Sequence, residues 1–150
     1  MSLIDTLADM NPLQMVEGAA KAALDKIAPR GKELIKGTYK ILSMGGAPDG
    51  LAAWEPLSPR SRGERFFMGV HPEVPMLARI EKRVPAALEG MAWSVEGTTL
   101  TYSTSEPLIE KNKRIKGRDA MVLSKADEGE LQAGTQEEFG KALNRKLLKG

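Results

Sequence analysis

The amino-acid sequence predicts an α+β fold in which an N-terminal helical region and a C-terminal helix pack on a small antiparallel β-sheet, with a long proline- and glycine-rich loop. Three observations predict it: a helix-like spacing of apolar residues before residue 42, an alternation of apolar and polar residues over 91–104, and a second helix-like spacing after residue 124. A chain of 150 residues is long enough to bury a core, so we expect one domain over 1–150.

The first element is a helical region over 1–42, and Asn11-Pro12 marks its start because proline is favoured in the first turn of a helix. Apolar residues then recur at helical spacing, at Leu13, Val16, Ala20, Ala23, Leu24, Ile27, Leu34, Ile35, Tyr39 and Leu42. Pro29 interrupts this pattern, since proline lacks a backbone N–H and clashes with the preceding turn. The region is therefore either two helices or one long helix kinked near Pro29.

A long connection is expected over 43–63, because this stretch contains four glycines and three prolines and has no helix or strand period. Connections of this length in a compact domain are usually functional or mobile. The connection also holds Trp54, one of the two tryptophans of the chain. We expect a large aromatic side chain in such a loop to pack into a pocket.

The region 64–123 is expected to be rich in β-structure, with a short helix over 76–84. Its clearest signal is a β-hairpin at 91–104, in which Glu96-Gly97 suits the turn because glycine accepts a positive φ. A hairpin alone is marginally stable, so it needs further strands or a covering helix. The apolar residues 120–123 are a candidate for another short strand.

The C-terminal helical region is predicted over 124–150. Two residue pairs resemble the capping boxes that begin helices, Ser124 with Asp127 and, more strongly, Thr135 with Glu138. Apolar residues then recur at helical spacing, at Phe139, Leu143 and Leu147. Several basic residues follow towards the chain end, where cations suit the helix dipole.

The residue types exclude several kinds of active site. The chain has no cysteine, which excludes a disulfide scaffold, a thiolate metal site and a cysteine nucleophile. The single histidine, His71, has no partner for a catalytic triad or for a two-histidine zinc site. No glycine motif of a phosphate-binding or dinucleotide-binding loop is present. The sequence therefore predicts a protein that is not an enzyme and that uses no cofactor or metal.

The sharpest charge feature is the run KNKRIKGR at 111–118, in a chain whose net charge is only +2. Its basic residues are Lys111, Lys113, Arg114, Lys116 and Arg118. The run is either a solvated loop tip or a contact for DNA phosphates or an acidic partner, and such a contact would be sensitive to salt. No aromatic residue is interleaved with it, so base stacking is not predicted.

Membrane association is not predicted. The sequence contains no run of 18 apolar residues that would suit a transmembrane helix. Asp5 and Asp9 fall within the first apolar stretch, which is unlike a signal peptide.

The stretch GAPDGLAAWEPLSPRSRGER resembles a segment of bacteriophage tail-completion proteins of the virion morphogenesis type, which carry a PDG…W-x-PLSP-x-[ST] pattern after an N-terminal helical region. The matching positions here are Pro48, Asp49, Gly50, Trp54, Pro56, Leu57, Ser58, Pro59, Arg60, Ser61 and Arg62. The hairpin at 91–104 and the passage 118–127 follow the family in outline only. The family's TG-x-L segment is replaced by residues 83–86, and its tyrosine and histidine by Leu108 and Lys111.

This resemblance implies a structural virion protein of the phage neck or tail end, which completes the tail or joins head and tail without catalytic activity. It implies assembly in the host cytoplasm into a ring, typically of six subunits, that lies between the connector or neck and the tail-tube or terminator proteins. DNA would pass through the lumen of the ring. The residues expected at a subunit or partner interface are Trp54, Pro56, Leu57, Pro59, Arg60 and Arg62.

Two questions stay open at the level of sequence. Trp54 anchors its loop either in the core of its own subunit or in a pocket of the next subunit, since tryptophan is common at the centre of interfaces. The competing function is that of a small nucleic-acid-binding or regulatory protein that uses the basic segment 111–118.

Overall fold

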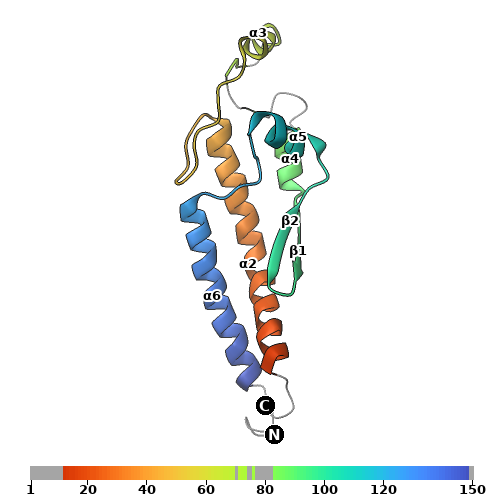
Figure 1. The fold of residues 1–150 in the computed structure, drawn as a ribbon, viewed down its shortest axis with the longest axis vertical. Coiled ribbons are helices and arrows are strands. Elements are labelled where there is room, and N and C mark those ends of the chain that lie inside the picture. Colours follow the sequence, from red (N-terminus) through yellow and green to blue (C-terminus); the bar gives the residue numbers. More distant parts are fainter. Residues whose placement is uncertain (1–11, 70, 74–75, 77–82, 149–150) are drawn as a thin grey trace. The chain divides into compact units, whose positions relative to one another are not determined.

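The computed structural model describes residues 12–69, 71–73, 76 and 83–148, with the backbone alone described for 12–15 and 115–116. The described chain is mostly helical and has one two-stranded antiparallel sheet (Figure 1). The elements in chain order are α2 (Pro12–Ser43), α3 (Pro59–Phe67), α4 (Arg83–Glu89), β1 (Ala92–Glu96), β2 (Thr99–Ser103), α5 (Pro107–Lys116) and α6 (Lys125–Leu148). The predicted α+β class, with helices towards both ends and a small antiparallel sheet, is confirmed.

Helix α2 is one continuous helix that contains Pro29. Of the two arrangements that the sequence left open, the single long helix is therefore the one formed. A proline inside a helix costs about 3 kcal/mol, so packing on either side of Pro29 has to offset this cost. Pro12 is the first helical residue, as predicted, while Asn11 lies outside the described residues.

The described residues cluster into two compact units, and each unit combines segments that are far apart in sequence. The first unit is formed by residues up to 31, by 92–102 and by 129 onwards. The second unit is formed by residues 32–91 and 103–128. Each unit therefore depends on long-range packing, because neither is a continuous stretch of chain.

In the first unit, α2 packs against α6 and the hairpin. The hydroxyl of Tyr102 on β2 donates a hydrogen bond of 2.6 Å to the carbonyl of Ala28. Gly31 is buried at this contact, and a side chain in its place would overlap the Tyr102 hydroxyl. Gly134 of α6 similarly faces the Ile27 side chain without room for a further methyl group. Glycines thus allow the elements of this unit to approach closely.

The hairpin confirms the clearest strand prediction to within one residue at each end. Its two-residue turn is formed by Gly97 and Thr98, and Gly97 has a φ of 59°. Val95, Leu100 and Tyr102 are half-buried, whereas the residues beside them in sequence are exposed. This alternation is the one expected for strands with a single covered face.

The core of the second unit lies around the C-terminal end of α2. Buried apolar side chains of this unit are Leu34, Ile35, Tyr39, Leu42, Trp54, Met76, Val84, Leu88, Met91, Ile109 and Ala120. Backbone contacts add to this packing, since the N–H of Met76 donates to the carbonyl of Ser43 at 2.8 Å. The hydroxyl of Thr38 donates to the carboxylate of Asp127 at 2.9 Å and so joins α2 to the first turn of α6 within this unit.

The prediction of a β-rich part over 64–123 is wrong except for the hairpin. Helices α4 and α5, and the end of α3, occupy most of its other described residues. Residues 120–123 form no strand, although Ala120 is fully buried. The short helix expected over 76–84 falls mostly on residues 77–82, which lie outside the described residues; the described chain resumes at Arg83, where α4 begins.

Local capping explains why these segments are helical. The carboxylate of Glu106 accepts the N–H of Leu108 at 3.1 Å and begins α5, and Gly117 ends it with a φ of 64°. Ser58 begins α3 in the same way, because its hydroxyl accepts the N–H of Ser61 at 3.2 Å. The extended connection predicted over 43–63 therefore ends at Ser58.

Helix α6 begins at Lys125, because the hydroxyl of Ser124 accepts the N–H of Asp127 at 3.2 Å. The predicted start at Ser124 is confirmed. The other predicted helix start, at Thr135, had the stronger capping pattern but is wrong. Thr135 lies inside α6, and its hydroxyl donates to the carbonyl of Leu131 at 2.6 Å. No helix among the described residues is long and apolar enough to cross a membrane.

Candidate functional site

Residues 44–58 form an arm, which connects α2 to α3 within the second unit. Trp54 anchors the arm: its side chain is 9% exposed, and its ring centroid lies 6.2 Å from that of Tyr39 on α2. The two rings are inclined by 58°, an arrangement that is favourable for aromatic pairs. Trp54 thus packs into the unit to which the arm belongs.

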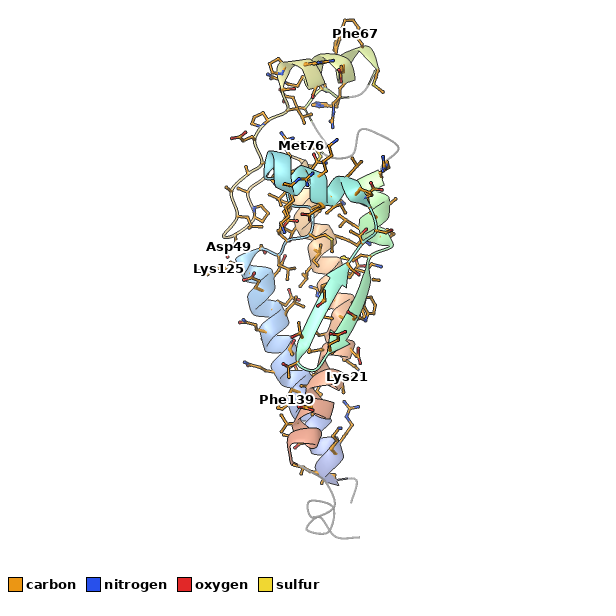
Figure 2. The ribbon with its side chains drawn as sticks, turned by 45° about the vertical axis from the view of Figure 1, so that its right-hand side comes forward. Lys21, Asp49, Phe67, Met76, Lys125 and Phe139 are labelled. Carbon is orange, nitrogen blue, oxygen red and sulfur yellow. The ribbon has the colours of Figure 1, made fainter. Side chains whose placement is uncertain are left out.

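The PDG turn forms a second attachment of the arm. The carbonyl of Asp49 accepts the N–H of Lys125 at 2.7 Å, and Figure 2 shows Asp49 beside Lys125. Gly50 has a φ of 78°, and a side chain there would come within 2.9 Å of the Cβ atom of Lys125. Only glycine therefore combines this backbone conformation with so close an approach to the start of α6.

Arg118 provides the third attachment. One terminal nitrogen of its guanidinium group donates to the carbonyl of Glu55 at 2.8 Å and to that of Pro56 at 3.2 Å. The residue is only 7% exposed, and its buried Nε has no hydrogen-bond partner among the described residues. Arg118 therefore holds the arm from inside the unit, and its guanidinium group is not available to a DNA phosphate.

A second buried arginine, Arg65 of α3, lies close enough to Tyr39 for its charge to act on the phenol. The Tyr39 hydroxyl donates to the carbonyl of Met76 at 3.3 Å. Burial raises the pKa of Tyr39 to about 12, because the phenolate would lose its hydration, and the Arg65 charge opposes this rise. The arm is thus packed against a phenol that strongly favours its neutral form.

The raised pKa of Tyr39 predicts a loss of stability at high pH. An unfolded tyrosine loses its proton near pH 10 and the folded one near pH 12, so the unfolded state is favoured increasingly between these values. The free energy of unfolding is expected to fall by up to about 3 kcal/mol over this range. Denaturant titrations at several pH values should show that the free energy of unfolding falls less in Tyr39→Phe than in the wild-type protein. An equal fall in both proteins would contradict the assignment.

Helix α3 carries an exposed apolar group at its C-terminal end, which we call the apolar tip and which consists of Phe66, Phe67 and Met68. Their exposed fractions are 72%, 89% and 61%. The two phenyl rings meet edge to face with centroids 6.0 Å apart, and Figure 2 shows Phe67 pointing outwards at the end of α3. Sequence reasoning missed this site, although the run of three large apolar residues between charged residues and glycine was a usable signal.

The other predicted interface residues lie on the arm and on the first turn of α3. Pro56, Pro59 and Arg60 are exposed, and Leu57 and Arg62 are half-buried. Arg60 contacts Glu64 at 3.3 Å on the same helix, and the Arg62 guanidinium lies 3.9 Å from the Glu73 carboxylate. The predicted set is thus divided between a buried anchor, Trp54, and an accessible surface that continues into the apolar tip.

The basic segment 111–118 is not a loop tip, because its residues 111–116 belong to α5. Lys111, Lys113 and Arg114 are exposed, and the ammonium of Lys113 lies 3.7 Å from the carboxylate of Asp119. Arg118 is buried, and the side chain of Lys116 lies outside the described part of the structure. The described cations of the segment are therefore divided between the exposed surface of α5 and the buried Arg118.

No group of three or more histidine or carboxylate side chains is arranged among the described residues to hold a metal ion. His71 accepts the N–H of Glu73 at its Nδ1 atom, at 3.2 Å. The exposed side chains of the apolar tip suit contact with a macromolecule.

No protein-family model, curated protein or solved structure matches the chain.

Proposed function

We propose that the protein is a structural component of a bacteriophage neck or tail end, which completes the tail or joins head and tail as one subunit of a ring. It acts by binding neighbouring subunits and not by catalysis. The resemblance of residues 48–62 to tail-completion proteins supports the proposal. The single observation that carries it is the apolar tip, which the fold holds in solvent at the end of a firmly anchored arm.

The exposure of the apolar tip requires a partner. Contiguous exposed apolar groups on soluble proteins mark interaction sites. Full burial of a phenylalanine side chain contributes roughly 1.5–3 kcal/mol, so Phe66 and Phe67 together would contribute about 3–6 kcal/mol to an interface. Such a contribution is large enough to decide whether subunits associate.

The anchoring of the arm supports the same role. Trp54 and Arg118 fix the arm, Ser58 begins α3 directly after it, and the buried Arg65 fixes the helix. The apolar tip is therefore held in place before binding, which lowers the entropy lost on association. A flexible loop that carried the same three residues would bind more weakly.

The chain itself offers a complementary surface, as expected for a ring built from identical subunits. Ring contacts pair two different surfaces of the same protein. Helix α3 carries two arginines that are not buried, Arg60 and Arg62, whereas residues 129–138 of α6, in the first unit, contain three carboxylates and no lysine or arginine. A basic helix with an apolar tip on one copy can therefore meet an acidic helix on the next copy.

The test is the oligomeric state of the double variant Phe66→Ser/Phe67→Ser. We expect the wild-type protein to form ring-sized assemblies in analytical ultracentrifugation and the variant to dissociate with an affinity weaker by at least about 100-fold. Its melting temperature should not change, because both residues are exposed. Leu148→Ser is the matched control, since it removes an equally exposed apolar side chain from the first unit.

A wild-type protein that stays monomeric at every concentration, alone and with phage neck or tail proteins, would contradict the proposal. The alternative function, a nucleic-acid-binding or regulatory protein that uses 111–118, has weaker support, because Arg118 is buried and Lys113 lies near Asp119.

A further inference from the structure

We propose that a cleft between α2 and α6 of the first unit binds phosphate groups, either of a nucleic-acid backbone or of free phosphate. The two helices run side by side here (Figure 1, Figure 2). The cleft has a volume of about 240 Å³ and is lined by Ala22, Lys26, Glu138, Ala142, Arg145 and Lys146. This site does not depend on ring assembly, and it lies in a different unit from the basic segment 111–118.

The cleft is strongly basic. Three of its six lining residues are cations, and none of the three forms an ion pair with another described residue. The single carboxylate, Glu138, lies 3.6 Å from the ammonium of Lys141, which neutralises part of its charge. The cations therefore repel one another across the cleft, and a bound anion would relieve this repulsion.

The packing of Lys146 brings it towards α2. Its ammonium and Cε atoms occupy the space that a side chain at Gly18 would fill. A glycine at this position thus lets the end of Lys146 lie directly over the α2 backbone. Ala22 and Ala142 add only methyl groups to the cleft, so its floor leaves room for a small anion between the cations.

The helix dipole of α6 explains the positions of only two of the three cations in the cleft. Arg145 and Lys146 lie in the last turn of α6, where cations are favoured by the helix dipole. Lys26, in contrast, lies inside α2, and its ammonium contributes nothing to that dipole interaction. The presence of Lys26 in the same cleft therefore favours a shared anionic ligand.

The ligand class follows from the donors and the size of the cleft. A guanidinium group binds two phosphate oxygens at once, and ammonium groups add point charges around them. Clefts for drug-sized ligands typically have volumes of about 300–1,000 Å³, so this smaller one fits a phosphate group and not a large organic molecule. Phosphate is thus better suited to the site than a bulky carboxylate-bearing ligand.

The test compares two triple variants of the full chain. Lys26→Ala/Arg145→Ala/Lys146→Ala removes the cations of the cleft. Lys40→Ala/Lys111→Ala/Arg114→Ala is the matched control, because it removes two lysines and one arginine, all exposed, from the second unit. Circular dichroism should show both variants folded, and Lys26→Ala alone serves as a milder variant should the first one unfold.

The probes are a fluorescent DNA duplex, followed by anisotropy, and inorganic phosphate, followed by amide NMR shifts near Ala22 and Ala142. The cleft variant should bind the duplex at least 10-fold more weakly, and its salt dependence, d log K/d log [salt], should be smaller in magnitude by roughly 2–3 than that of the wild type. Duplex binding without phosphate shifts would identify a nucleic-acid backbone as the ligand. Phosphate shifts without duplex binding would identify free phosphate.

Three outcomes would overturn the proposal. The first is the absence of both signals in the wild-type protein. The second is an equal loss of binding in the matched control, which would show that binding is not specific to the cleft and depends on net charge or on the basic segment 111–118. The third is binding of polyglutamate as tight as that of the duplex, because an acidic protein surface would then be the better ligand.

Discussion

Replacement of Trp54 by alanine is expected to destabilise the second unit by about 3–5 kcal/mol. The side chain is almost fully buried, and its loss leaves a cavity that the proline-containing arm cannot easily fill. The ring contact with Tyr39, worth about 0.5–1.5 kcal/mol, disappears at the same time. Trp54→Phe keeps an aromatic ring at this position and is expected to cost less.

The two tryptophans allow each unit to be followed separately, since Trp54 belongs to the second unit and Trp93 to the first. In a Trp93→Phe background, urea titration by fluorescence reports on the second unit while Trp54 is present; because Trp54→Ala lacks this fluorophore, its cost is measured by urea titration followed by circular dichroism. In Trp54→Ala, the remaining Trp93 reports on the first unit. A cost below about 1 kcal/mol, together with loss of the assembled state, would show that Trp54 anchors a neighbouring subunit instead.

The fold was predictable where a local pattern agrees with the packing. The hairpin followed from its alternation and from Gly97, and the helical ends followed from apolar spacing. The start of α6 shows the limit of this reasoning. Ser124 and Thr135 carry similar capping signals, and the bond from Thr38 to Asp127 favours the first of them. A contact between residues this far apart in sequence leaves no local pattern.

The site was less predictable, because a run of like charges in sequence need not share one surface. Gly117 has a left-handed conformation that ends α5, and the next residue, Arg118, turns into the core. The cleft around Lys26 and Arg145 is the reverse case, because its cations are far apart in sequence but close together in the fold. Its cations come from two helices, and their proximity depends on how α2 and α6 are aligned, which apolar spacing alone does not determine.

Replacement of Arg118 by alanine is expected to release the arm while leaving duplex binding unchanged. Hydrogen bonds from a charged donor contribute about 1.5–3 kcal/mol each, and Arg118 donates to two carbonyl groups of the arm. Its buried Nε lacks a partner, and this desolvation cost of about 1–3 kcal/mol disappears with the side chain. The net loss should therefore be about 2–4 kcal/mol.

Hydrogen exchange measures this loss at a defined atom, because the N–H of Lys125 is bonded to the carbonyl of Asp49 on the arm. Its exchange should become roughly 30-fold faster or more in Arg118→Ala, since about 1.4 kcal/mol corresponds to a factor of ten. Arg118→Lys should show an intermediate effect, because an ammonium group retains the charge but not the geometry of the guanidinium group. Weaker duplex binding with unchanged exchange would instead make Arg118 the nucleic-acid contact that the sequence first suggested.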